Sequence, residues 1–133
     1  MIGLDTNVVV RYITQDDPTQ SPLAVKLIRS LTPEDPGFLS AVAIAELVWV
    51  LEASYGFTKK ELVEVLDTLL RSKELNIEQA EIVTQAVRQF GSGNTDFADC
   101  LIERISHSAG CHHTLTFDRK AAKFAGMRLV HSV

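Results

Sequence analysis

Five acidic residues stand at positions where a carboxylate is not needed for solubility: Asp5, Glu46, Asp96, Asp99 and Asp118. Each of them interrupts or ends an apolar segment instead of decorating a polar face, so the fold has to gather them. Carboxylate oxygens are the ligands that hard divalent cations such as Mg²⁺ and Mn²⁺ prefer. The five acids therefore predict a metal site.

Glu46 is the most informative of these acids, because it is the only charged residue between positions 41 and 51. Burying an unpaired carboxylate raises its pKa or costs on the order of several kcal/mol. We therefore expect Glu46 to be buried and to have a partner, which is either a metal ion or a structural ion pair.

The aspartates also have simpler explanations. An aspartate between a strand and a helix commonly caps the helix, which applies to Asp5 and Asp118. An acid in the first turn of a helix interacts favourably with the helix dipole, which is the simpler explanation for Asp96. In that case Asp99 alone takes part in the chemistry. Asp96 and Asp99 are three residues apart, so both are expected on one side of a helix.

Short apolar runs alternate with helical periodicity along the chain, which predicts a largely parallel sheet covered by helices on both faces. Ser40 and Thr58 are expected to cap two of the helices, and Thr58 forms a capping box with Glu61. Ligands of such sheets bind beyond the carboxyl ends of the strands, where Asp5 and Asp118 are expected. The predicted strands cover residues 1–5, 38–39, 75–77, 112–117 and 129–130.

The composition indicates one domain over residues 1–133, since no linker is visible and 46% of the residues are hydrophobic. Cys100 and Cys111 are expected to be reduced core thiols, which fits a cytoplasmic protein, and no apolar run is long enough to span a membrane.

The net charge of −4 argues against nucleic-acid binding by a large positive surface. Four basic residues between positions 119 and 128 either contact a phosphate backbone or form a solvated helix face.

Four segments, in this order and spacing, resemble the PIN-domain ribonucleases, and among them the VapC-type toxins of prokaryotic toxin–antitoxin pairs. The resemblance covers essentially the whole chain. The segments are Ile2 to Asn7, Ser40 to Leu47, Asp96 to Ile102, and Thr116 to Arg119.

The resemblance implies a three-layer α/β/α sandwich with a five-stranded parallel sheet. It also implies a metal-dependent endoribonuclease, in which Mg²⁺ or Mn²⁺ supports hydrolysis of RNA phosphodiester bonds. The residues implied as catalytic and metal-binding are Asp5, Glu46, Asp99 and Asp118, with Asp96 as an additional acid beside the metal. Thr6, Ser40 and Thr116 are expected to hydrogen-bond the ligand carboxylates.

The VapC-like character further implies a homodimer and a cognate antitoxin protein, one segment of which blocks the acidic site. A phosphotransferase that uses two aspartates after the first strand is disfavoured, because Asn7 stands in place of the second acid. The remaining alternative is a catalytically inactive PIN-like module that keeps the acids and only binds a partner.

Overall fold

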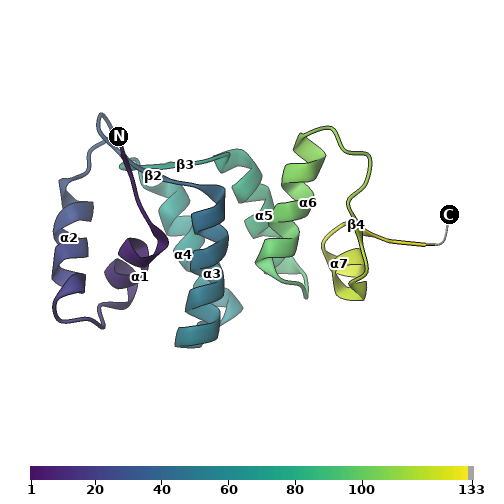
Figure 1. The fold of residues 1–133 in the computed structure, drawn as a ribbon, viewed down its shortest axis with the longest axis horizontal. Helices are drawn as coiled ribbons and strands as arrows, with labels where there is room; N and C mark the ends of the chain where they lie inside the picture. Colours follow the sequence, from purple (N-terminus) through teal and green to yellow (C-terminus); the bar gives the residue numbers. More distant parts are fainter. Residues whose placement is uncertain (132–133) are drawn as a thin grey trace. The chain divides into compact units, whose positions relative to one another are not determined.

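The computed structural model describes residues 1–131, and the chain divides into two compact units that are each described by themselves. The first unit comprises residues 1–78, and the second begins at residue 79 (Figure 1). The last two residues of the predicted domain lie outside the described residues.

The first unit contains a parallel sheet of three short strands in the order β1-β2-β3. The strands are β1 (Ile2–Gly3), β2 (Gly37–Leu39) and β3 (Leu75–Ile77). Gly37 leaves room for the buried Leu4 side chain, because a Cβ atom there would lie 2.7 Å from Cδ1 of Leu4. Asp5 follows directly after Leu4.

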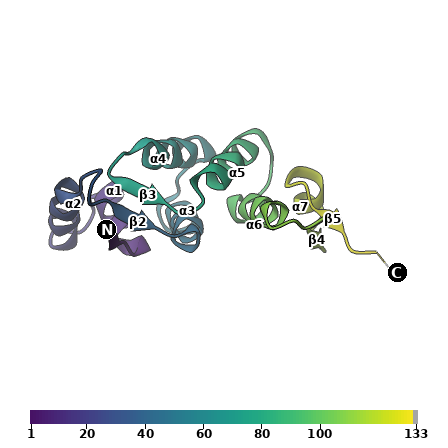
Figure 2. The same ribbon diagram turned by 90° about the horizontal axis from the view of Figure 1, so that it is seen from above.

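Four helices complete the first unit: α1 (Thr6–Thr14), α2 (Gln20–Ser30), α3 (Ala41–Tyr55) and α4 (Lys59–Arg71). α1 packs against both α2 and α3, and Figure 2 shows α4 beside β3. The predicted caps are confirmed, since Ser40 Oγ accepts a hydrogen bond from the Ala43 amide and Thr58 forms the capping box with Glu61. Local chemistry therefore sets the start of both α3 and α4.

The second unit packs α5 (Ala80–Ser92) side by side with α6 (Phe97–Ser108) (Figure 1). Phe90 and Phe97 meet edge to face in this packing, with their ring centroids 5.7 Å apart. The strands β4 (Leu115–Thr116) and β5 (Arg128–Leu129) pair in parallel, and α7 (Arg119–Phe124) connects them in the sequence. Asp118 lies between β4 and α7 as predicted, but Phe117 separates it from the end of the strand, which is shorter than predicted.

The α/β class is confirmed, but the prediction of one five-stranded sheet is wrong for the described residues. All five strands are present and all their pairings are parallel, yet they form one sheet of three strands and another of two. Each strand has only two or three residues, and its ladder is made within its own unit. The predicted strand 112–117 shrinks to Leu115–Thr116, since only these two residues pair with β5.

The cysteine prediction is half right: Cys100 is buried in α6, but Cys111 is exposed in the segment before β4. Within residues 1–131, no helix has the length and apolar character needed to cross a membrane. A single domain over residues 1–133 stays a prediction.

Candidate functional site: two groups of carboxylates

Asp5 and Glu46 line the same pocket of the first unit, although 40 positions separate them in the sequence. Asp5 stands between β1 and α1, and Glu46 projects from α3, so the packing of α1 on α3 brings them together. The pocket measures about 480 Å³. Its other lining residues are Thr6, Asn7, Val10, Arg11, Val50, Ser54 and Tyr55.

Asp5 caps α1, which is the simpler role that the sequence allowed for it. Its Oδ1 atom accepts a hydrogen bond from the Thr6 amide at 2.8 Å. The cap engages one carboxylate oxygen, and the residue is exposed where it lines the pocket. Capping and ligand binding are therefore compatible at this position.

The expected burial of Glu46 is wrong, because the structure exposes this residue. α3 is apolar on most of its circumference, but Val42, Glu46 and Trp49 form an exposed stripe at positions i, i+4 and i+7. Among the side-chain hydrogen bonds and ion pairs of the described residues, none involves the Glu46 carboxylate. The alternative of a structural ion pair is therefore not realised among the described residues, and the Glu46 charge is left for a ligand of the pocket.

The second unit holds the other three acids. Asp99 lies in the first turn of α6 and is partly buried. Burial raises the pKa of Asp99 above its ordinary value, and the neighbouring charges of Asp96 and Asp118 raise it further. Asp99 therefore stands in a region of excess negative charge that a cation would relieve.

Asp96 and Asp118 both occupy the residue before a helix, but only Asp118 caps with its side chain. Asp118 Oδ1 accepts hydrogen bonds from the amides of Lys120, at 2.8 Å, and Ala121, at 3.2 Å. Asp96 makes no such bond to α6. The capping explanation thus holds for Asp118 and fails for the Asp96 side chain.

The three hydroxyl residues expected to support the acids all bond to the main chain. Thr6 is buried and donates to the Ala43 carbonyl oxygen at 3.5 Å, which ties α1 to α3. Ser40 accepts from the Ala43 amide, and Thr116 accepts from the Asp118 amide at 3.0 Å. The Thr116 hydroxyl therefore bonds the main-chain amide of Asp118 and not its carboxylate.

The family of the chain can be stated from its sequence as a whole. Residues 2–127 match the PIN domain family. The chain belongs to this family. It is also similar to a VapC ribonuclease from Aquifex aeolicus (strain VF5), with 22% identity over 120 residues that cover 90% of this chain and 89% of that protein. The resemblance drawn from the four sequence segments is thus confirmed.

The donor atoms of this PIN domain fit a hard divalent cation. Every candidate ligand is a carboxylate oxygen, and the pKa of Asp99 is raised first by burial and then by the charges of Asp96 and Asp118, both of which a bound cation would offset. Within each unit, considering only the part of the chain that the structure describes, no three His, Cys, Asp or Glu side chains lie close enough to hold a metal ion. The acids thus stand as one pair, Asp5 with Glu46, and one group around Asp99.

The sequence analysis missed a polar cluster on the wall of the Asp5 pocket. Arg11 and Tyr55 line the pocket, and both hydrogen-bond Asp16 in the segment after α1. The sequence does contain a signal for this cluster. Asn7 and Arg11 are one helical turn apart on the helix that Asp5 caps, so their side chains lie on the same face of that helix.

Proposed function

We propose that this PIN-domain chain is a metal-dependent endoribonuclease that hydrolyses RNA phosphodiester bonds, as the toxin of a VapBC-type toxin–antitoxin pair. The observation that carries the proposal is the pocket shared by Asp5 and Glu46, in which the Glu46 carboxylate has no ion-pair partner among the described residues. Membership of the PIN family and similarity to a VapC ribonuclease support it.

In this proposal Asp5, Glu46, Asp99 and Asp118 hold Mg²⁺ or Mn²⁺, with Asp96 beside them. When bound, the ion supplies positive charge that polarises the phosphoryl group and favours ionisation of water. The proposal also keeps a single domain over residues 1–133 with a three-layer α/β/α arrangement.

The side chains have distinct roles in the proposed reaction. Asp118 is held by two amide hydrogen bonds on Oδ1, so its carboxylate is fixed in orientation. Glu46 is exposed and lacks such bonds, which suits a base that orients or deprotonates the attacking water. The water oxygen then bonds to phosphorus while the bond from phosphorus to the leaving oxygen breaks.

The proposed partners are single-stranded or looped RNA, a cognate antitoxin and a second copy of the chain, in the cytoplasm. The exposed stripe on α3 supports the homodimer, because Val42 and Trp49 are 79% and 68% exposed. Large apolar side chains with that exposure are typical of surfaces that a partner covers.

The proposed function is tested by incubating a mixed RNA substrate with purified protein in Mg²⁺, in Mn²⁺ and in EDTA. The Asp99→Asn variant is assayed in parallel, with Asp67→Asn as a matched control, because Asp67 lies on α4 outside both acid groups. We expect cleavage that requires the metal, survives in Asp67→Asn and falls at least about 100-fold in Asp99→Asn. If folded wild-type protein, freed of any bound partner, cleaves nothing with either metal, the chain is a binding module and the proposed activity is wrong.

A further inference from the structure

We infer that Arg11 is a substrate-binding residue of this site, and that its guanidinium contacts a phosphate of the RNA backbone beside the bond that is cut. The inference rests on the proposed function, because it assigns a role within that same pocket. Nothing in the composition points to it, since the chain is acidic overall.

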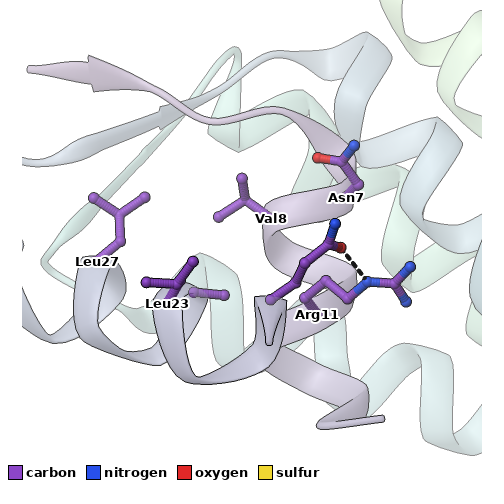
Figure 3. A pocket seen from close by; sticks show the side chains of 7 residues that line it. Asn7, Val8, Arg11, Leu23 and Leu27 are labelled. Carbon is purple, nitrogen blue, oxygen red and sulfur yellow. Dashed lines mark hydrogen bonds between the residues drawn. The ribbon is translucent and has the colours of Figure 1, made fainter. Parts of the chain in front are cut away.

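The first observation is the position of Arg11. It lines the pocket of Asp5 and Glu46, and it also lines a neighbouring groove of about 240 Å³ between α1 and α2. Figure 3 shows this groove, with Asn7 and Arg11 on α1 opposite Leu23 and Leu27 on α2. Arg11 therefore stands at the boundary between the acid pocket and a second, mostly apolar hollow, since both are lined by Asn7 and Arg11.

The second observation is the way in which the guanidinium is held. Its Nε atom donates to Gln20 Oε1 at 2.8 Å, the bond drawn in Figure 3. Its Nη1 atom donates to Asp16 Oδ1 at 3.3 Å and to the Tyr55 hydroxyl at 3.2 Å. These three bonds use the hydrogens of Nε and Nη1, and they fix a side chain that otherwise has many rotamers.

The donors that remain are those of Nη2, which makes none of the hydrogen bonds formed among residues 1–131. The Arg11 side chain is 30% exposed and lines the acid pocket, so a ligand of that pocket can reach it. A fixed guanidinium with unused donors matches the oxygens of a phosphate, and it pays little entropy on binding.

The third observation concerns charge. Although Arg11 lines the acid pocket, its ion pair is with Asp16 and not with Asp5 or Glu46. Asp16 is itself held, because it accepts hydrogen bonds from Thr14 at 2.7 Å and from the Tyr55 hydroxyl at 2.7 Å. Asp16 and Tyr55 thus act as positioning residues that keep the cation at the pocket wall without neutralising the acids that the metal requires.

The test compares wild type with Arg11→Gln, Arg11→Lys and a matched control, Arg29→Gln, in RNA cleavage and in RNA binding. Arg29 is exposed on α2 and does not line the acid pocket, so this control removes the same charge elsewhere. KM and kcat are measured from about 50 to 200 mM salt. Binding of a labelled single-stranded RNA pool is measured in EDTA over the same range, and thermal melts of every variant establish that it is folded.

We expect Arg11→Gln to raise KM about five- to tenfold while kcat stays within about twofold, since a backbone contact adds binding and not chemistry. The slope of log affinity against log salt should fall by about 0.7, the value of one phosphate contact on a single strand. Arg11→Lys should keep the slope, because the charge remains. Arg29→Gln should change KM by less than about twofold.

Tyr55→Phe tests the positioning role, since it removes the hydroxyl that bonds both Arg11 and Asp16. It should raise KM about two- to fivefold in the wild type and have no further effect in Arg11→Gln, because the residue to be positioned is then absent.

The outcomes separate this inference from the proposed function. Cleavage with an unchanged KM and salt slope in Arg11→Gln overturns the inference and leaves the nuclease in place. RNA binding that depends on Arg11, without any cleavage by wild type, overturns the nuclease and supports the phosphate contact. Absence of both cleavage and binding in folded wild-type protein overturns both.

Discussion

Asp118 carries two roles in this structure, a helix cap and a proposed metal ligand, and two substitutions separate them. Asparagine at this position keeps an oxygen that can accept from the amides of Lys120 and Ala121, but it lacks the negative charge. Alanine removes both the oxygen and the charge. A pure cap predicts that Asp118→Asn is active, whereas a metal ligand predicts that it is as inactive as Asp118→Ala.

The expected magnitudes follow from the contacts. Replacing a capping aspartate by alanine costs about 1 kcal/mol, and up to about 2 when the cap is well formed. The Asp118 carboxylate accepts two amide hydrogen bonds on one oxygen, which places it toward the upper part of that range. For a chain of 133 residues we expect Asp118→Ala to lower the Tm by about 5–7 °C. Asp118→Asn should lower it by no more than about 2 °C, through loss of the dipole interaction.

The assay pairs thermal melts in EDTA with cleavage of the mixed RNA substrate in Mn²⁺, at a temperature where all three proteins are folded. We expect both variants to lose at least about 100-fold in activity, although only Asp118→Ala is markedly less stable. Full activity in Asp118→Asn would refute the assignment of Asp118 as a ligand and leave it as a cap. A large loss of stability in Asp118→Asn would refute the capping estimate.

Three further predictions concern the rest of the chain. The pKa of Asp99 is raised in the folded state, so ionisation of Asp99 destabilises the folded protein as pH rises through that pKa. Metal-free Asp99→Asn should therefore have a higher Tm than wild type at pH 7. The difference in Tm should shrink as pH falls toward the ordinary aspartate pKa of about 3.9. Added Mn²⁺ should raise the Tm of wild type and not of Asp99→Asn, and an equal rise in both would argue against Asp99 as a ligand. Thr58→Ala should cost about 1 kcal/mol by denaturant titration through loss of the capping box, with unchanged cleavage per folded molecule.

The parts of the fold that the sequence predicts well are those decided by chemistry within a few residues. The cap at Ser40 and the capping box at Thr58 follow from one side chain and a nearby amide, and both are present. The buried face of α4 is explained by helical spacing, because Leu62, Leu66 and Leu69 stand at positions i, i+4 and i+7. The strand at Leu75–Ile77 has the predicted bounds.

The misjudged features depend on contacts between distant segments. Strand length is one example: the apolar run 112–117 looks like a full strand, but only the residues that face β5 acquire a partner. The environment of Glu46 is another, because an apolar window says nothing about which side of a helix is covered. One stripe of α3 faces solvent, and Glu46 lies on it between Val42 and Trp49. Position on the helix, not average hydropathy, decides the burial of that carboxylate.

The polar cluster around Arg11 shows why a pocket needs more than its acids to be understood. Five carboxylates alone would repel a polyanion, so a nuclease site requires positive charge that the acids do not consume. In the proposed function, a metal ion supplies part of that charge. In the first unit the structure supplies another part, because Asp16 and Tyr55 hold Arg11 at the pocket wall while Asp5 and Glu46 stay unpaired with it. An acidic chain can thus present a cation to RNA at one point without a basic surface, and the salt dependence of the Arg11 variants measures that contribution directly.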